Sequence, residues 1–370
     1  MRLLDRLVLS EVIGPFFGSA MLFTGLFLAG GEFMRLAEYA QKGVPPWLIV
    51  QLVLLSLPPI IALTFPMAML LASLLGTGRM SGDSEIVAMT AAGISFPRII
   101  VPVAAFAFLV SLAGVYINDT IVPISARGRQ AIIDDQKRKA GQSVGTGAIA
   151  YQFRSEHEMI DVRAEGGLRP SAAGPPSLGR VSITMWKDGR VDRFFYASEA
   201  VWVPGTRDWT LSDDFYGTDY SSKEGYVVVS GLSGKTEAVA IATPADLEAL
   251  QRPVIEITTR GLRDRARVLR GRGNEEGARE AEVEMARRLA VPFATLVFAL
   301  VGAPLGVRPQ RGGKGVGFGL SVLITFLYWI ALQFMSVIGR GGTIPPGVAV
   351  MIPNLIGLAV GIFLIRRVLR

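Results

Sequence analysis

The residues whose types and spacing could do chemistry gather in one short polar stretch. GRMSGDSEIVAMTAAGIS (residues 78–95) lies between two long uncharged runs. Asp83 and Ser84 favour a helix start, Glu85 suits the positive end of a helix dipole, and Gly93 stops the helix after about two turns. This pattern predicts that the helix docks on another protein, because it offers one carboxylate and is connected at both ends to long apolar segments.

The side chains of this predicted helix suit contact with another protein. Ile86, Val87, Met89 and Ala92 supply a small apolar surface beside Glu85. A short helix of this kind can dock in the groove of a partner and pass a push to the segments that hold it. The alternative is a helix that lies at the lipid interface. Interfacial helices usually carry Lys and Arg on the polar face, and this one carries neither.

The rest of the sequence supports no catalytic site. Gly234, Lys235 and Thr236 resemble the end of a phosphate-binding loop, but Val229 stands where its first glycine belongs. No HExxH, GxSxG or paired-carboxylate pattern with supporting context appears in the rest of the polar segment that contains them. The chain has no cysteine, and its one histidine, His157, lies in a polar segment. We therefore expect a chain that is not an enzyme and holds no cofactor or metal of its own.

The elements around the docking stretch are apolar enough to cross a membrane. The chain has 370 residues, of which 50% are hydrophobic. Uncharged runs, each able to span roughly 30 Å of hydrocarbon as a helix, cover residues 12–31, 47–78, 99–118, 289–307, 315–339 and 341–365. None contains the Asp, Glu or His that a gradient-driven transporter usually needs, so we expect energy to come from a partner.

The distribution of basic residues predicts the orientation of these spans. Basic side chains near the span ends mark the cytoplasmic side, and they gather on the side of the N-terminus. That side holds Arg2, Arg6, Arg79, Arg98, Arg308, Arg311, Lys314, Arg366, Arg367 and Arg370, and the other has Arg35, Lys42 and Arg340 in its short loops. Both termini are predicted to be cytoplasmic. The net charge of +7 follows mostly from this asymmetry, so no nucleic-acid partner is expected.

The segment between the third and fourth spans predicts an inserted all-β domain. RVSITMWKDGRVDRFFYASEAVWV alternates as two strands around an Asp-Gly turn, and DWTLSDDFYGTDY and EGYVVVSG continue the pattern. We predict an α-helical membrane protein with six transmembrane helices and this β-domain. Its predicted parts are spans one to three (1–123, with the docking helix at about 83–93), the β-domain (124–255), a charged connecting helix (256–281) and spans four to six (282–370).

Three stretches resemble one protein family. GRMSGDSEIVAMTAAGIS resembles the cytoplasmic loop of the LptF/LptG permease family. EMARRLAVPFATLVFALVGAPLG is similar to the fourth span of that family, and residues 313–367, with a Pro-Pro turn and a terminal Arg pair, are similar to its last two spans. The resemblance covers essentially the whole chain and is weakest over residues 140–279.

The resemblance implies a subunit of the ABC transporter that extracts lipopolysaccharide from the inner membrane and passes it to a periplasmic bridge. In that family two permease chains pair over a dimer of an LptB-like ATPase, which holds the ATP and Mg, and an LptC-like protein is a further partner. Each permease carries a periplasmic β-jellyroll. The residues implied to meet the ATPase are Asp83, Glu85, Ile86, Met89 and Gly93.

The resemblance also implies a lipid path, since spans one and five form lateral gates in the family. An apolar cavity must accept the acyl chains, and aromatic side chains of these spans are its candidate lining. The candidates are Phe23, Phe27, Phe318 and Phe326, each of which could instead simply pack or face lipid. Arg35 and Lys42 are the candidates for lipid phosphates. A local ion pair with Glu32 or Glu38 is an equal alternative for Arg35.

Two other functions stay open on the sequence alone. One is a gradient-driven secondary transporter of a lipid or other amphiphile, and the other is a membrane-anchored scaffold or enzyme whose outer β-domain does the work. Within the family, the sequence does not choose between an F-like and a G-like chain, or between a homodimer and a heterodimer.

Overall fold

A computed structural model gives the arrangement of the chain. It describes residues 3–368 apart from 42, 140–148, 155–157, 170–173, 213, 221–226, 231–237, 242, 245–246, 248–252, 272 and 308–312. The chain divides into two compact units. The first comprises Met1–Ile132, Thr258–Leu262 and Glu282–Arg370, and the second comprises Ile133–Ile257 and Arg263–Ala281.

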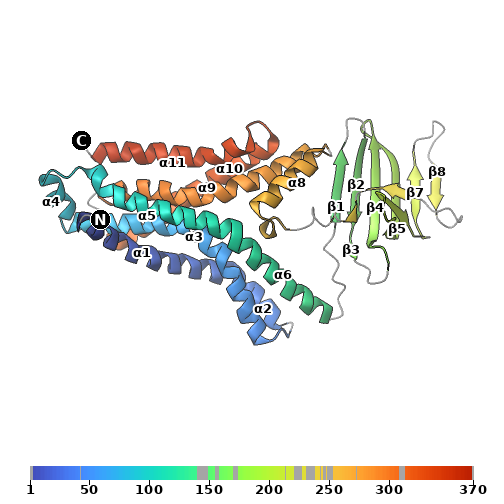
Figure 1. Cartoon of the computed structure of the whole chain (residues 1–370), viewed down its shortest axis with the longest axis horizontal. Coiled ribbons are helices and arrows are strands. Elements are labelled where there is room, and N and C mark those ends of the chain that lie inside the picture. The colour runs from blue at the N-terminus through green and yellow to red at the C-terminus, as the bar shows by residue number, and fades with distance from the viewer. Residues whose placement is uncertain are drawn as a thin grey trace. The chain divides into compact units, whose positions relative to one another are not determined.

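Long helices form the first unit (Figure 1). They are α1 (Leu3–Phe27), α2 (Phe33–Gln41), α3 (Pro46–Gly82), α5 (Phe96–Tyr116), α6 (Val122–Lys139), α9 (Glu275–Gly306), α10 (Gly313–Gly341) and α11 (Pro346–Val368), with the short α4 (Glu85–Ala91) between α3 and α5. Over the described residues, six continuous helical segments are long and apolar enough to cross a membrane. The six predicted spans are therefore confirmed as helices.

Two of these spans run on beyond their apolar runs. The π-helical turn η1 (Leu28–Glu32) joins α1 to α2, and η2 (Ile117–Ile121) joins α5 to α6. The predicted β-domain was placed from residue 124, but residues 122–139 are helical. The reason is local: ISARGRQAIIDDQKRK is rich in strong helix formers and contains no proline.

The charged segment before the fourth span also differs from the prediction of one connecting helix. It forms α8 (Thr259–Gly271), and a second helix, α9, begins at Glu275 and continues through the fourth span. Gly273, with φ +75°, ends α8, and the Asn274 side chain accepts a hydrogen bond from the Gly277 N–H at 2.8 Å. A left-handed glycine followed by an asparagine cap separates the two helices. The spacing of the charged residues alone predicts a single helix.

Small residues bring α3 and α9 into close contact. Gly302 and Gly306 of α9 face the hydroxyls of Ser73 and Thr77 of α3, and a Cβ at either glycine would collide with them. These hydroxyls donate to carbonyls of their own helix, Ser73 to Met69 at 2.8 Å and Thr77 to Ser73 at 2.6 Å. Close backbone approach of this kind is how helices associate in lipid. It fixes the end of α3 from which α4 departs.

The second unit contains an antiparallel sheet of nine strands in the part of the chain that the structure describes. The strands are β1 (Ile149–Arg154), β2 (Glu158–Ala164), β3 (Leu168–Arg169), β4 (Ser177–Lys187), β5 (Arg190–Trp202), β6 (Asp208–Leu211), β7 (Tyr216–Asp219), β8 (Val227–Ser230) and β9 (Ala238–Ala240). The main path runs β1-β2-β4-β5-β6-β9. The predicted hairpin is confirmed: β4 pairs with β5 across Asp188 and Gly189, both with positive φ as a tight hairpin turn requires.

Alternating apolar side chains give this sheet its core. Val181 and Ile183 of β4 and Phe195 and Ala197 of β5 are buried, and Trp209 of β6 is completely buried among them. Successive side chains of a strand point to opposite faces, so the period-two pattern puts one face of the sheet inside. With no cysteine in the chain, this packing holds the unit together without disulfides.

One hydrogen bond joins the C-terminal end of the third span to the start of α8. The Asp119 side chain, in η2, accepts a hydrogen bond at 2.8 Å from the backbone N–H of Thr259, the first residue of α8. The first N–H groups of a helix have no partner inside the helix, and a carboxylate satisfies one of them. Asp119 thus serves as an N-cap supplied from a distant part of the chain.

We predict that Asp119→Ala lowers the free energy of unfolding by about 1 kcal/mol, the usual value of an N-cap. The matched control is Asp264→Ala, because Asp264 forms only an exposed surface pair with Arg267 and should change stability by about 0.5 kcal/mol or less. Thermal unfolding of the purified full chain in detergent measures both. Equal midpoints for the two variants would contradict the capping role.

Candidate functional site

The segment that carries the candidate site is the turn between α3 and α5. Ser84 takes the left-handed conformation (φ +58°) and begins α4. At the other end the Gly93 N–H donates to the Thr90 carbonyl and the Ile94 N–H to the Met89 carbonyl, both at 3.0 Å. With Gly93 at φ +81°, these two bonds form the Schellman termination expected from its glycine. The sequence therefore sets both ends of α4 locally.

One face of α4 is packed into the helical unit. Ile86 is 4% exposed and belongs to a buried cluster that includes Met80 at the end of α3 and Phe96 at the start of α5. Met89 and Ile94 are partly buried against the same cluster. Met89 and Ile94 stand at the two positions of a Schellman motif where an apolar pair is usually found. Because apolar side chains on one side pack against the unit, α4 is held by this packing and not only by its two connecting loops.

The opposite face of α4 is free. Val87 is 63% exposed, and Ala88, Ala91 and Ala92 are exposed beside it. Glu85 is half-buried, and within the described residues the structure records no hydrogen bond or ion pair for its carboxylate. An uncompensated carboxylate next to a slim apolar strip is suited to a partner surface that offers a cation beside a shallow groove.

The predicted coupling residues thus divide into two groups. Asp83 and Glu85 stand at the surface, and Asp83 lies 3.7 Å from the Arg79 guanidinium. Ile86 and Met89 point inward and hold the helix, while Gly93 ends it. The side chains of Val87 and the alanines are exposed beside Glu85. The apolar pattern of the sequence included these residues but did not show which face of the helix is buried.

Polar contacts join this end of α3 to α1 and to the residue after α9, and a further ion pair joins α5 to α1. Arg79 pairs with Glu11 of α1 at 3.0 Å, and Ser81 donates a hydrogen bond at 2.7 Å to the carbonyl of Val307, just after α9. Arg98 of α5 pairs with Asp5 of α1 at 2.8 Å. These ion pairs and this hydrogen bond were not predicted from the sequence. The available signal was the two carboxylates at the start of the chain, which can balance the two arginines that flank α4.

The candidate lipid-binding aromatics come partly together. Phe23 of α1 is buried and stacks against Phe318 of α10, with ring centroids 6.1 Å apart and planes 13° from parallel. Phe27 and Phe326 are exposed and have no ring contact with this pair among the described residues. Spans one and five therefore meet at Phe23 and Phe318, and the other two rings face outward.

The basic candidate that the structure describes, Arg35, lies in α2, beyond the end of α1 that is remote from α4. Arg35 is exposed and pairs with Glu32 at 3.2 Å, so the local ion pair weighed from the sequence is present. Glu32 also pairs with Arg129 of α6 at 3.1 Å. One guanidinium of this cluster, that of Arg35, remains open to the surroundings, with 63% of its side chain exposed. Lys42 lies outside the described residues.

Comparison with known proteins decides the family. The family model described as lipopolysaccharide export system permease LptF/LptG matches residues 6–367. The chain belongs to this family. The lipopolysaccharide export system permease protein LptG of Escherichia coli K12 is 24% identical over 321 residues, covering 85% of this chain and 84% of that protein. LptF of the same organism is 22% identical over 342 residues, covering 90% and 86%.

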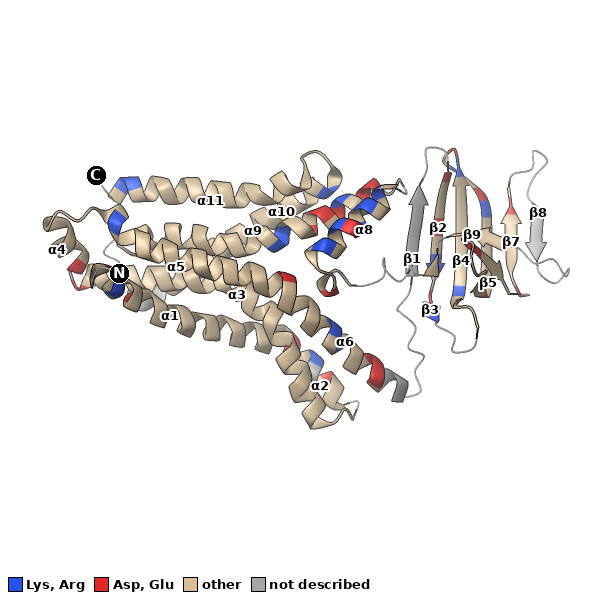
Figure 2. Cartoon of the chain, viewed as in Figure 1, with Lys and Arg blue, Asp and Glu red and all other residues tan. Residues whose placement is uncertain are grey.

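In this LptF/LptG chain, the candidate site is a short helix displayed at one end of the helical unit. Among the described residues no group of His, Cys, Asp or Glu side chains could hold a metal ion. The ribbons of α1, α3, α5, α10 and α11 are mostly tan, and their charged residues lie toward the helix ends (Figure 2). What the site offers is a displayed helix whose buried face packs into an apolar cluster shared with α1, α3, α5 and α9. The end of α3 beside it has polar contacts with α1 and with Val307, just after α9.

We predict that Ile86→Ala and Val87→Ala differ sharply although they are neighbours. Loss of the buried Ile86 side chain should cost about 2–5 kcal/mol of stability, because it leaves a cavity under α4. Loss of the exposed Val87 side chain should stay within about 0.5 kcal/mol. Thermal unfolding of the two purified variants checks this. A stability loss at Val87 as large as that at Ile86 would show that the faces are assigned wrongly.

Proposed function

We propose that this chain is a permease subunit of an ABC transporter that extracts lipopolysaccharide from the inner membrane and passes it to a periplasmic bridge. The family and the names of its relatives support this function. The chain itself hydrolyses nothing in this proposal. ATP and Mg are held by a dimer of an LptB-like ATPase, a second LptF/LptG-like chain completes the permease, and an LptC-like protein joins the assembly.

The observation that carries the proposal is the arrangement of α4. Its outward face is a narrow apolar strip with the unpaired Glu85 carboxylate, and its inward face is packed through Ile86. A push from an ATPase on such a helix reaches the bundle without first deforming a loop, because protein interiors are close-packed and transmit displacement. This is the arrangement that a subunit powered from outside requires.

The carboxylates within the long helices support an external energy source. Asp5, Glu11 and Glu32 lie toward the ends of the first span, and each is paired with arginine. A proton-driven carrier needs a carboxylate that takes up and releases protons along a path through the membrane. Carboxylates held by guanidinium groups near the membrane surfaces do not supply one, so the described part of the chain offers no site that favours the gradient-driven alternative.

The proposed orientation follows from charge and connectivity. Arg79, Arg98, Arg366 and Arg367 gather at the end of the helical unit where α4 and both termini lie (Figures 1 and 2). By the positive-inside rule this end is cytoplasmic. The third span separates α4 from the β unit, so the β unit is periplasmic, where the family's jellyroll domain would meet the bridge.

The proposed lipid path lies between α1 and α10. Separation of the stacked Phe23 and Phe318 would open an apolar wall that continues over the exposed Phe27 and Phe326. Near the opposite end of α1 from α4, the exposed guanidinium of Arg35 is placed to meet a lipid phosphate. Acyl chains would then follow the aromatic wall while the charged headgroup stays at the outer surface.

The test is charge reversal on α4. We predict that Glu85→Lys weakens association with the partner ATPase about tenfold or more, since a charge-assisted contact contributes about 1.5–3 kcal/mol. ATP-driven lipopolysaccharide release from proteoliposomes should fall in parallel. The matched control is Glu276→Lys, because Glu276 is an exposed carboxylate near the start of α9. Membrane insertion should be normal in both variants.

Two outcomes would overturn the proposal. One is normal ATPase association and normal release by Glu85→Lys, which would remove α4 from the docking surface. The other is lipid movement by the isolated chain under an imposed ion gradient without nucleotide, which would establish a secondary transporter instead. Activity of the β unit without the spans would favour the scaffold or enzyme alternative.

A further inference from the structure

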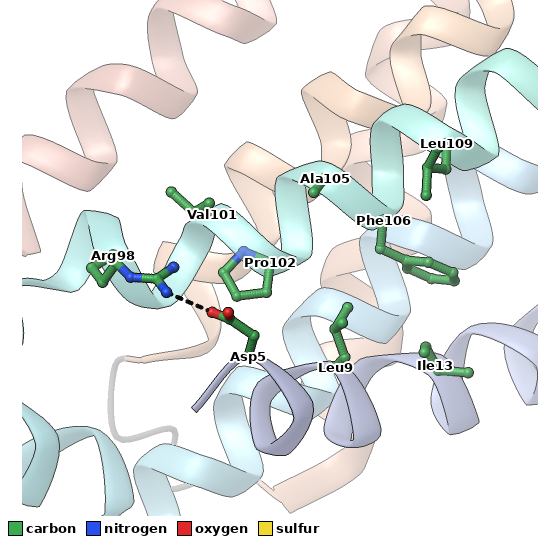
Figure 3. A pocket seen from close by; sticks show the side chains of 9 residues that line it. All are labelled: Asp5, Leu9, Ile13, Arg98, Val101, Pro102, Ala105, Phe106 and Leu109. Carbon is green, nitrogen blue, oxygen red and sulfur yellow. Dashed lines mark ion pairs between the residues drawn. The ribbon is translucent and has the colours of Figure 1, made fainter. Parts of the chain in front are cut away.

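A groove separate from the proposed export path runs between α1 and α5. It has a volume of about 280 Å³ and lies at the end of the bundle that carries α4 (Figure 3). Its walls are apolar side chains from both helices. They include Leu9 and Ile13 of α1 and Val101, Ala105, Phe106 and Leu109 of α5.

One end of the groove is polar. The Asp5 carboxylate and the Arg98 guanidinium meet there at 2.8 Å, with 16% and 32% of their side chains exposed (Figure 3). Pro102 lines the groove one turn further along α5. Proline has no N–H, so the Arg98 carbonyl lacks the donor that the fourth following residue usually provides in a helix. This end of the groove holds a guanidinium and a carboxylate within a partly sheltered space.

The dimensions of the groove match one membrane leaflet. Eleven helical steps separate Arg98 from Leu109, which is roughly 16 Å at 1.5 Å per residue. The hydrocarbon of a bilayer is about 30 Å thick, so the groove extends through about half of it. Val101 and Leu109 are 54% and 64% exposed, so the groove opens outward along its length. In the membrane, its natural occupant is the acyl chain of a lipid.

The polar end decides which lipid fits. An acyl chain gains little hydrophobic free energy on moving from the bilayer to an apolar groove, so selectivity must come from the headgroup. An anionic headgroup would place an unbalanced negative charge beside Asp5. A headgroup with a phosphate and a primary ammonium adds no net charge: the phosphate meets the Arg98 guanidinium, and the ammonium donates to the Asp5 carboxylate.

We propose that this groove binds a membrane glycerophospholipid with a primary-amine headgroup, held by Asp5 and Arg98, with one acyl chain along α5. The lipid is a resident of the permease rather than its exported cargo. In the proposed orientation it belongs to the cytoplasmic leaflet. It fills the space between α1 and α5 next to α4, at the point where the bundle receives force.

Native mass spectrometry of the delipidated full chain, titrated with phosphatidylethanolamine, tests this site. The wild-type chain should retain one tightly bound lipid. Ala105→Trp fills the groove and should weaken its binding tenfold or more, and Ala113→Trp, at an exposed position of α5 outside the groove, should leave it unchanged. The double variant Asp5→Asn with Arg98→Gln keeps a neutral hydrogen-bonding pair between the helices and should also lose the lipid.

Four results would overturn the assignment. Retention of the lipid by Ala105→Trp would show that it does not occupy the groove. Equal binding of phosphatidylglycerol, or unchanged binding by the double variant, would remove the headgroup role of Asp5 and Arg98. Equal competition by soluble glycerophosphoethanolamine would show that the acyl chain contributes nothing. None of these results depends on lipopolysaccharide export, so the site can fail while the proposed function stands.

Discussion

The burial of Ile86 beneath α4 is the contact on which the proposed coupling depends. A two-turn helix in a loop has little stability of its own, since helix nucleation is costly and short helices are marginal in water. Packing of Ile86, Met89 and Ile94 against the ends of α3 and α5 makes it a fixed part of the bundle. Its other face is left free. Force applied there can therefore displace helices rather than bend a loop.

The neighbouring contacts determine where such a displacement would go. α3 is central, because its small residues touch α9 and its terminal Arg79 reaches α1. The Arg98 pair joins α5 to the same region of α1. At the far end of α1, Glu32 holds both Arg35 and Arg129, so α1 and α6 are also connected there. The stacked Phe23 and Phe318 lie between these two ends of α1. A shift of α1 thus links the docking end to the proposed lipid entry.

Much of this architecture follows from sequence periodicity, and the remainder follows from contacts between distant residues. Long uncharged runs predict the spans, and alternation around Asp188 and Gly189 predicts the β4-β5 hairpin, because each signal is local. The capping of Thr259 by Asp119 joins residues far apart in the chain, and the sequence contains no local trace of it. For α4, spacing predicts the helix but not which side is buried. That depends on where Met80 and Phe96 are placed by their own helices.

The most direct measurement of the central claim is site-specific photo-crosslinking from position 87 in the assembled transporter. A photoreactive residue in place of Val87 should join this chain to the ABC ATPase, while the same residue in place of the buried Ile86 should give no such product. Crosslinks from position 87 to lipid alone, in an assembly that contains the ATPase and hydrolyses ATP, would contradict the account. α4 would then lie in the membrane interface, and energy would have to enter the permease elsewhere.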